Sequence, residues 1–472
     1  MVSFVASLLI GTHGWKSDNF EVILHRSAGM VAPENTVPAL EAAVRQGADG
    51  IEIDIRRTVD GHFVLYHDDW MLDTLGAGVK VEDLTLAEVR DLDIGARWGS
   101  QWRGLRVPLL SDVLEFARVN RLLLYYDIKT PNIDAELRAL TDKAQVADLV
   151  IFPERLASPN RPKLDWVSGW NYLDGGEEDV SKIQALVEHQ GGKPVRFMVD
   201  DARAFSIALK RNPAHRRFVP YRETSPPASE RLAADLKSPD KAQVRRGIWR
   251  QAQSPAAGAW PRVRELVESD DPHLALDAIW AMGASSNPED TVRLRRLGLK
   301  PSTQDPRNHP SGMPYFDTYR LAAVACSLVR QNSAAAHEAL RGIAAEGGFA
   351  SQAVTVAYTA HGQSDHILAF IGTVESPKAP ELGFALQHAA RHPFAREIYR
   401  VALGSGGMVR RNAVFGLAAL HRERPEIARL ADLMADSNPQ VRSGATLAQF
   451  WADFAWPAQS ESEGDSESVF AR

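Results

Sequence analysis

The chain has 472 residues, of which 44% are hydrophobic and 24% charged, the composition of a globular protein. This length exceeds one ordinary domain and predicts about two or three. The formal net charge of −6 gives no electrostatic reason to bind nucleic acid or an anionic membrane surface. The single cysteine, Cys326, excludes a disulfide within the chain and suits a reducing compartment without requiring one.

Residues 1–20 form an N-terminal segment whose apolar stretch, Val2 to Ile10, is about half as long as a membrane span. No basic residue precedes this stretch and no clear small-residue cleavage site follows it, so it matches a secretory signal poorly. We expect a cytoplasmic protein and leave export open. No other stretch is long and apolar enough to predict a transmembrane segment.

Short apolar runs alternate with amphipathic runs over residues 21–225. The predicted strands are Glu21–His25, Gly50–Ile55, His62–Tyr66, Leu122–Ile128, Asp148–Phe152, Asp165–Trp170, Pro194–Val199 and Arg217–Tyr221. The predicted helices between them include Thr36–Gln46, Asn132–Ala144, Glu178–His189 and Ala202–Lys210. Eight strands that alternate with helices over ~200 residues predict a (β/α)8 TIM barrel. The strands at Asp165 and Arg217 are weak, and without them a smaller open α/β sheet is the alternative.

The composition changes after a linker at residues 221–229, and the following stretch is rich in Ala, Leu and Arg. A turn followed by a helix with small residues recurs about every 30 residues, for example from Val244 to Leu274. This period predicts an all-α solenoid of HEAT-like repeats over residues 230–456, with an irregular helical bundle as the alternative. Residues 457–472, mainly Ser, Glu and Gly, predict a disordered tail.

Two carboxylates lie two positions apart near the end of the second predicted strand. Because alternate residues of a strand point the same way, Glu52 and Asp54 share one face. Two acids on one face repel each other unless a cation or a basic group lies between them. Oxygen ligands suit a hard divalent cation such as Mg²⁺, Ca²⁺ or Mn²⁺. The alternative for such a pair is a solvated position at the edge of a loop.

Four short motifs follow one another near the start of the chain: His25-Arg26, Pro33-Glu34-Asn35-Thr36, Glu52-x-Asp54 and His67-Asp68. Their order resembles the glycerophosphodiester phosphodiesterase family, a group of metal-dependent phosphodiesterases built on a TIM barrel. The resemblance covers roughly residues 21–225. It implies hydrolysis of glycerophosphodiesters to glycerol 3-phosphate and an alcohol.

The resemblance implies roles for the two histidines and the arginine. Hydrolysis of a phosphodiester needs a base for the nucleophile and an acid for the leaving group, and histidine can be either near neutral pH. We therefore expect His25 and His67 to be catalytic, with no sequence signal for which is the acid. Arg26 would bind phosphate oxygens through its guanidinium. Along a regular strand Arg26 would point away from His25, so this role requires the chain to turn there.

Further residues match later motifs of the family. Asp127 and Lys129 share one face of a predicted strand. The resemblance implies that Asp127 joins the first two carboxylates as a metal ligand and that Lys129 faces the phosphate. The family has Glu where Asp127 stands, so this ligand reaches about one bond length less far. Glu34 and Asn35 are possible additional contacts to metal or substrate, and Phe197 matches an aromatic position of a late strand.

Other positions depart from the family and put the substrate in doubt more than the reaction. Ser27 replaces the glycine that usually follows the His-Arg motif, and a hydroxyl side chain restricts that turn. A basic residue usual after the His-Asp motif is missing at Leu72–Thr74. Asp200 stands where asparagine is usual, and the usual Thr-Asp-x-Pro element is not evident near the end of the last predicted strand.

Two alternatives to a glycerophosphodiesterase stay open. Segment Asp69–Val107 contains Trp70, Trp98 and Trp102, which would line an acyl-chain groove in a phospholipase D-like enzyme for lysophospholipid or sphingolipid diesters. The other alternative is a non-catalytic binding protein in which the helical repeats offer a concave surface to a protein partner. The presence of both histidines and all three acids favours catalysis.

Overall fold

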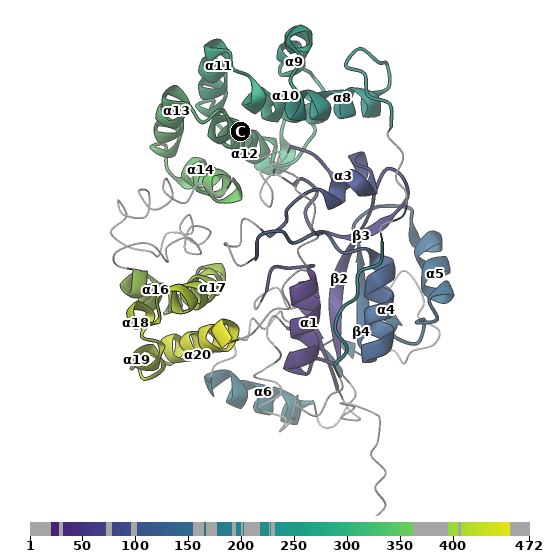
Figure 1. Cartoon of the computed structure of the whole chain (residues 1–472), viewed down its shortest axis with the longest axis vertical. Coiled ribbons are helices and arrows are strands. Elements are labelled where there is room, and N and C mark those ends of the chain that lie inside the picture. Colours follow the sequence, from purple (N-terminus) through teal and green to yellow (C-terminus); the bar gives the residue numbers. More distant parts are fainter. Residues whose placement is uncertain are drawn as a thin grey trace, which may run out of the picture.

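The computed structural model describes residues 20–27, 32–71, 78–95, 102–153, 165–166, 177–190, 195–199, 202, 218–225, 227, 232–361, 395–404 and 407–453. An α/β lobe precedes residue 226 and a helical region follows it. Figure 1 shows the helical region above this lobe and along its left side. The predicted tail and all but one residue of the predicted N-terminal segment lie outside the described residues.

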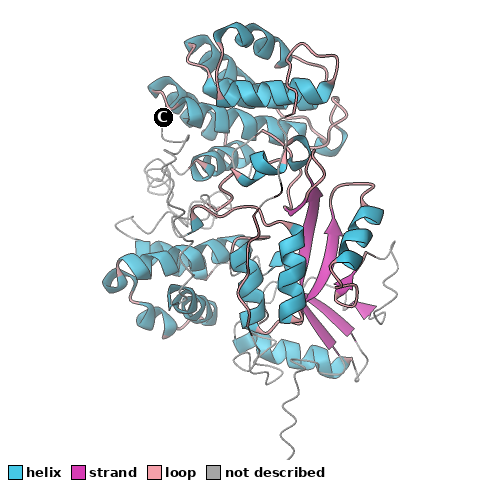
Figure 2. Cartoon of the chain, turned by 45° about the vertical axis from the view of Figure 1, so that its right-hand side comes forward, coloured by secondary structure: helices cyan, strands magenta, loops and turns pink. Residues whose placement is uncertain are grey.

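In the described part of the α/β lobe, the strands form one sheet, drawn in magenta in Figure 2. The strands are β1 (Phe20–Leu24), β2 (Gly50–Arg57), β3 (Phe63–Leu65), β4 (Leu123–Ile128), β5 (Val150–Ile151), β6 (Asp165–Trp166) and β7 (Val195–Val199). Their order is β5-β4-β2-β1-β7-β6, and every neighbouring pair along this path is parallel. Strand β3 pairs with β2 in the antiparallel direction.

This strand order is that of a barrel opened between two neighbouring strands. From β1 the chain order runs through β2, β4 and β5 on one side and backwards through β7 and β6 on the other. The last parallel strand therefore pairs with the first, as in a (β/α)8 barrel. Among the described residues no pairing joins β5 to β6. The lobe is thus a curled, TIM-barrel-like parallel sheet, and the prediction of a complete eight-stranded barrel is confirmed only to that extent.

Two of the predicted strands do not take a place in the parallel barrel. The run His62–Tyr66 does form β3, but a tight turn at Gly61 (φ 89°) folds it back onto β2 as a hairpin. In the run Arg217–Tyr221, the described residues 218–221 are not a strand. Strand β7 already occupies the edge of β1, and the side chain of Asn120 instead bonds both the N–H and the carbonyl of Val219.

Helices cover the sheet, and their ends follow local sequence signals. They are α1 (Val37–Gln46), α3 (Leu86–Arg90), α4 (Leu110–Asn120), α5 (Asp134–Lys143) and α6 (Glu177–His189). Helix α1 begins where the Thr36 hydroxyl accepts a hydrogen bond from Ala39 N–H, and it ends at Gly47 in a left-handed conformation (φ 79°). Strand β2 is buried on both faces, so Glu52 and Asp54 lie in the interior of the curled sheet. The predicted helix Ala202–Lys210 lies outside the described residues except for Ala202.

All the secondary-structure elements described after residue 231 are helices, joined by turns and loops. The helices are α8 (Lys241–Gln253), α9 (Trp260–Leu266), α10 (Pro272–Ala281), α11 (Pro288–Gly298), α12 (Phe316–Gln331), α13 (Ala334–Ala344), α14 (Gly348–Ala360), α16 (Ala395–Leu403), α17 (Gly407–Glu423), α18 (Pro425–Ala428), α19 (Leu430–Met434) and α20 (Pro439–Asp453). Helix α10 contacts α8 and α12, α12 contacts α14, and α11 contacts α13. Such contacts between alternate helices suit a stacked array, but a HEAT-like solenoid and its boundaries stay predictions. None of the described helices combines the length and apolar character needed to cross a membrane.

The two parts of the chain meet through aromatic side chains of the Asp69–Val107 segment. Trp70 is 2% exposed and its ring lies parallel to that of His273 on α10, with 5.5 Å between centroids. Trp102 is 3% exposed and contacts the ring of Phe415 on α17 edge-on. The suggestion that these tryptophans line an open acyl-chain groove is therefore wrong for both, because the helical region covers them. Trp98 lies outside the described residues.

Candidate active site

The chain turns immediately after β1. The strand ends at Leu24, and His25–Ser27 form a 3₁₀ turn in which Arg26 (φ 48°) and Ser27 (φ 60°) are left-handed. This turn is bonded to β2, because Arg26 N–H donates to Glu52 Oε2 at 2.6 Å and Ser27 Oγ donates to the Glu52 carbonyl at 3.4 Å. Since the strand has ended, the alternation that would point His25 and Arg26 to opposite sides no longer applies.

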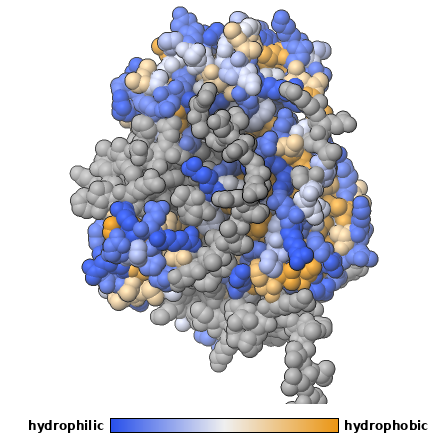
Figure 3. Space-filling view, in the orientation of Figure 1, coloured by the Kyte–Doolittle hydropathy of each residue, from blue (hydrophilic) through white to orange (hydrophobic). Residues whose placement is uncertain are grey.

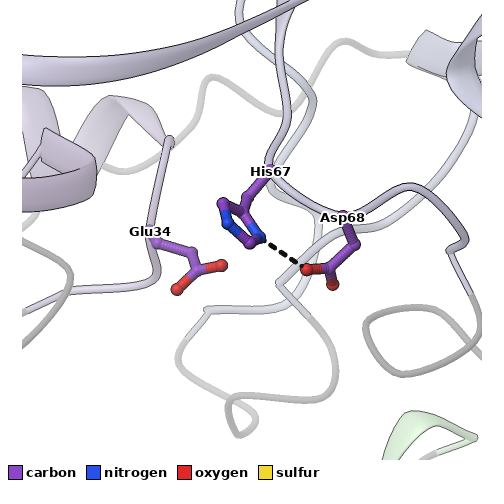
Figure 4. A group of neighbouring side chains, drawn as sticks. All are labelled: Glu34, His67 and Asp68. Atoms are coloured by element: carbon purple, nitrogen blue, oxygen red, sulfur yellow. Dashed lines mark hydrogen bonds and ion pairs between the residues drawn. The ribbon is translucent and has the colours of Figure 1, made fainter. Parts of the chain in front are cut away.

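Arg26 brings two other motifs together. Its Nη1 donates to both carboxylate oxygens of Glu34 at 3.1 Å, and its Nη2 lies 2.8 Å from Nε2 of His67. On the other side of the imidazole, Nδ1 lies 2.8 Å from Oδ1 of Asp68. Figure 4 shows His67 between the two carboxylates. A guanidinium only donates and a carboxylate only accepts, so Nε2 accepts from Arg26 and Nδ1–H donates to Asp68.

This group of side chains faces an opening in the surface. The side chains of Arg26, His67 and Asp68 are 27%, 28% and 30% exposed. A pocket beside them is lined by Glu34, Asn35, Leu65, Tyr66, His67, Asp68 and Ile94. The imidazole is therefore partly exposed at this pocket.

Three carboxylates form a second group deeper in the sheet. Strands β2 and β4 are in register with Asp54 opposite Asp127, and Glu52 lies on the same face of β2. One oxygen from each of these three residues lies within 4.8 Å of the others. Asn35 orients Asp54, because its Nδ2 donates to Asp54 Oδ2 at 2.7 Å and its Oδ1 accepts from Asp54 N–H at 3.1 Å.

Charge in this group is only partly balanced. Burial and the neighbouring charge of Asp54 raise the pKa of Glu52 well above its usual range. Lys129 Nζ lies 2.7 Å from Asp127 Oδ2 and 3.0 Å from Asp54 Oδ1. Burial alone would lower the pKa of Lys129, but these two carboxylates raise it above its usual value. One ammonium thus faces three acids, and the group keeps an excess of negative charge.

The donor set fits a hard divalent cation. All three candidate ligands offer carboxylate oxygens, and Glu52 and Asp54 are only 3% and 1% exposed. Lys129 Nζ lies 3.0 Å from Asp54 Oδ1, so a cation bound to this oxygen would share it with the ammonium or displace the ammonium from it. Glu34, His67 and Asp68 also lie close enough together to hold an ion, but Arg26 already occupies Glu34 and His67.

Most predicted site residues lie near the carboxyl ends of β1 and β4, beside Glu52 and Asp54 in the middle of β2. His25 is half-buried at the first position of the turn after β1. Phe197 is 3% exposed within β7 and occupies a core position. Sequence reasoning missed the role of Asp68 as the partner of His67, although the two are adjacent. It also missed Arg56, whose Nη2 donates to the His67 carbonyl at 2.7 Å.

A curled parallel sheet with carboxylates along β2 and β4, next to a histidine and an arginine that follow β1, has the arrangement of a TIM-barrel enzyme. Residues 25–202 match the model of the glycerophosphoryl diester phosphodiesterase family, so the α/β lobe carries a domain of that family. The match confirms the resemblance carried by the order of the motifs.

Curated relatives share part of this domain. The chain is 38% identical over 121 residues, 25% of its length, to 50% of a glycerophosphodiester phosphodiesterase from Caldanaerobacter subterraneus. It is 33% identical over 124 residues, 24% of its length, to 42% of a glycerophosphodiester phosphodiesterase from Bacillus subtilis. The chain thus spans half of these relatives or less. A crystal structure of the Agrobacterium tumefaciens glycerophosphodiester phosphodiesterase matches 40% of this chain and 99% of that one, at 21% identity and a TM-score of 0.33.

Proposed function

We propose that the α/β lobe hydrolyses glycerophosphodiesters to glycerol 3-phosphate and an alcohol. The observation that carries this proposal is the arrangement around His67, whose Nδ1 faces Asp68 while its Nε2 faces Arg26. An imidazole held by a carboxylate on one nitrogen can exchange a proton at the other, as acid–base catalysis requires. The family match of residues 25–202 and the names of the relatives support the same substrate class.

The bonds and protons of the reaction divide among the residues as follows. A nucleophile, water or the glycerol 2-hydroxyl of the substrate, bonds to phosphorus, and the bond from phosphorus to the alcohol oxygen breaks. Attack by water gives glycerol 3-phosphate directly, whereas attack by the 2-hydroxyl gives a cyclic phosphate that a water molecule then opens to glycerol 3-phosphate. His67 takes the proton of the nucleophile, because its Nε2 is the accepting nitrogen in this structure. His25 gives a proton to the departing alcohol oxygen. Arg26 and Lys129 offset the negative charge of the phosphoryl oxygens.

Arg26 also determines when His67 can accept a proton. In the free site its guanidinium bonds both Glu34 and Nε2 of His67. A phosphodiester offers the guanidinium a stronger, bidentate partner than an imidazole nitrogen. Binding of the substrate would draw Arg26 toward the phosphate and leave Nε2 able to accept a proton from the nucleophile.

The carboxylate group would hold the divalent cation of the enzyme. Glu52, Asp54 and Asp127 would be its ligands, and Asn35 would orient Asp54. When bound, a divalent cation supplies positive charge that stabilises negative charge on the reacting oxygens. Mg²⁺, Ca²⁺ and Mn²⁺ all suit an oxygen donor set.

The test is release of glycerol 3-phosphate from glycerophosphocholine and glycerophosphoethanolamine. Chelator-treated protein is assayed alone and with Mg²⁺, Ca²⁺ or Mn²⁺ added back. We expect release that depends on the cation and is lost in His67→Ala and His25→Ala. His62→Ala is the matched control, because His62 precedes β3 and lies outside both groups of site residues. No release with any cation, from protein shown to be folded, would overturn the proposed function.

The alternatives gain no support from the structure. A phospholipase D-like enzyme for lipid diesters would need Trp70 and Trp102 at an open acyl-chain groove, and both side chains are buried. Among the described residues, large exposed hydrophobic side chains of the helical region include Val292 and Phe349, on different helices. The described part of the face in Figure 3 is mostly hydrophilic over this region. A protein partner for a HEAT-like array remains a proposal from the sequence.

A further inference from the structure

Two adjacent acids of one short turn face different parts of the molecule. The 3₁₀ turn Val81–Asp83 lies in the segment that joins β3 to α4. Glu82 Oε1 accepts from Arg56 Nη1 at 2.9 Å, and Arg56 belongs to β2. Asp83 Oδ2 lies 2.6 Å from Nη1 of Arg245, which belongs to α8 of the helical region. One turn therefore joins the two parts of the chain through an ion pair on each side.

On the side of the α/β lobe, the ion pairs end at the proposed base. Arg56 is 3% exposed, and its Nη2 donates to the His67 carbonyl at 2.7 Å and to Asp69 Oδ1 at 2.7 Å. The guanidinium thus bonds the His67 backbone before Asp68 and the Asp69 side chain after it, and Asp68 itself bonds the imidazole. Because a guanidinium is planar and rigid, a shift of Glu82 is passed on to the backbone of His67.

On the side of the helical region, the ion pairs end in a buried bidentate contact. Arg245 Nε donates to Asp277 Oδ2 at 2.6 Å, and its Nη2 donates to Asp277 Oδ1 at 3.2 Å. Asp277 belongs to α10 and is 4% exposed. The pair fixes α8 against α10 and holds the Arg245 guanidinium in the direction of Asp83.

A second, independent contact reaches the same loop. Trp70 follows His67 by three positions and stacks on His273 of α10. The charged ends of Lys80 and Arg245 each lie 5.2 Å from the centre of its ring. Three groups therefore contact the ring of Trp70, and its 2% exposure leaves it little room to move. The loop His67–Trp70 is held by the helical region through both a ring contact and an ion-pair network.

We infer that helices α8 and α10 position the catalytic loop, so that Asp83, Arg245 and Trp70 are positioning residues for His67. This inference rests on the proposed function of His67 as the base. The proposed phosphate-binding residues keep other partners, Glu34 for Arg26 and two carboxylates for Lys129, so loss of the contacts should lower kcat much more than it changes KM. A displacement of about 1 Å at a catalytic group typically lowers the rate by about 100-fold.

The first test compares Asp83→Asn with Asp290→Asn. The first change leaves Arg245 paired with Asp277, so the protein should remain folded. The control removes a carboxylate that pairs with Arg264 within the helical region, at 2.8 Å for both bonds. We expect Asp83→Asn to lower kcat by at least about 10-fold with KM changed by less than about threefold, and Asp290→Asn to change neither. Equal kcat in the two folded variants would overturn the inference.

The second test uses the ring contact and does not depend on the ion pairs. Trp70→Ala removes the ring that stacks on His273, whereas Trp70→Phe keeps a smaller one. We expect Trp70→Ala to lose kcat and Trp70→Phe to recover most of it. A variant that loses both kcat and metal binding would be generally unfolded, so each variant is also titrated with Mn²⁺. A folded, metal-binding Trp70→Ala protein with the kcat of the wild type would contradict a positioning role.

A spectroscopic readout separates this inference from the proposed function. The ring resonances of His67, assigned by their loss in His67→Gln, report the environment of the imidazole without any substrate. We expect Asp83→Asn to shift these resonances and Asp290→Asn to leave them in place. If Asp83→Asn shifts these resonances but the wild-type protein cleaves no glycerophosphodiester, the proposed function is overturned and the positioning of His67 by Asp83 stands. If Asp83→Asn leaves the resonances in place and the wild-type protein hydrolyses the substrate, the positioning of His67 by Asp83 is overturned and the proposed function stands.

Discussion

Asn35 and Asp54 bond each other in both directions: the amide of Asn35 donates at 2.7 Å to Asp54 Oδ2, and its oxygen accepts from Asp54 N–H at 3.1 Å. Asn35 is 2% exposed and holds a left-handed backbone conformation with φ 53°. The pair fixes one oxygen of a candidate metal ligand, and the other oxygen faces the ammonium of Lys129 at 3.0 Å. Residues that orient metal ligands typically contribute about 10–100-fold to metal affinity.

Asn35→Gly should therefore weaken metal binding by about 10–100-fold. Glycine removes the amide and accepts a left-handed backbone without strain, so the change isolates the two hydrogen bonds. Calorimetric titration with Mg²⁺ or Mn²⁺ measures the effect. Asn35→Ala is the companion variant, and its additional loss of stability reports the cost of the backbone conformation. Unchanged affinity in Asn35→Gly would show that Asp54 is oriented without this amide.

Glu52→Gln should stabilise the metal-free protein while removing its response to metal. Glutamine keeps an oxygen that accepts from Arg26 N–H and removes a buried charge next to Asp54. We expect the free energy of unfolding to rise by about 1 kcal/mol, or roughly 2–4 °C in Tm. Thermal unfolding of chelator-treated protein, with and without Mn²⁺, measures both effects.

The matched control for this variant is Glu41→Gln. Burial also raises the pKa of Glu41, which is 3% exposed and accepts from Tyr221 N–H at 2.9 Å. Glu41 lies on α1 outside the carboxylate group, so the control should keep the full metal-induced rise in Tm. A Glu52→Gln protein whose Tm rises with Mn²⁺ as much as that of the wild type would contradict the ligand assignment.

Asp68→Asn should lower kcat by about 100-fold or more with little change in KM. The carboxylate accepts from Nδ1–H of His67 and so leaves Nε2 as the accepting nitrogen. An amide can offer either its oxygen or its NH₂ group, so the preference for one tautomer is weakened. Steady-state kinetics measures the loss, and the nitrogen chemical shifts of the His67 ring report the tautomer. Full activity with a changed tautomer would remove His67 from proton transfer.

His273→Phe should make the protein less sensitive to acid. Burial, and then the positive charges of Lys80 and Arg245, lower the pKa of His273 to about 4. Between its unfolded value of about 6.5 and this value, the unfolded state binds a proton that the folded state does not, so stability falls as the pH falls. Lys241 also lowers this pKa and Asp271 raises it, without reversing the direction.

Asp277 acts in the opposite sense at the same contact. Burial raises its pKa to about 6, so the folded state binds a proton first and gains stability as the pH falls toward its unfolded value of about 3.9. His273→Phe keeps a ring beside Trp70 and removes only the histidine contribution. Urea unfolding at about pH 7 and about pH 5 should show a smaller loss for the variant than for the wild type. An equal loss would show that the histidine is free to take a proton in the folded state.

The site could be predicted from sequence because its chemistry follows strand ends. Alternation along one strand places Glu52 beside Asp54, the family resemblance implies that Asp127 joins them, and the register of β2 with β4 puts Asp127 opposite Asp54. Carboxyl ends of parallel strands meet at one edge of a sheet, so residues far apart in sequence converge there without further information. The turn at Arg26 was named as a condition, and its left-handed backbone fulfils it.

The predictions that were wrong or missing concern features that the sequence of a single strand or segment does not determine. The apolar run around Val64 indicates a strand but not its direction, and the turn at Gly61 makes it antiparallel. Trp70 and Trp102 have the composition of a groove lining, and only the helical region shows that they are covered. The role of Arg56 was missed because its partners lie in a loop whose path depends on the rest of the fold.

The turn Val81–Asp83 limits how this chain can change in length. Glu82 and Asp83 are consecutive, yet one pairs with Arg56 and the other with Arg245 on the opposite side. Inserting or deleting a single residue nearby would rotate both acids away from their arginines at once, whereas an exchange of one acid for another would keep the charges in place. Related chains that keep this contact should therefore vary in sequence before and after the turn but hold the number of residues within it constant.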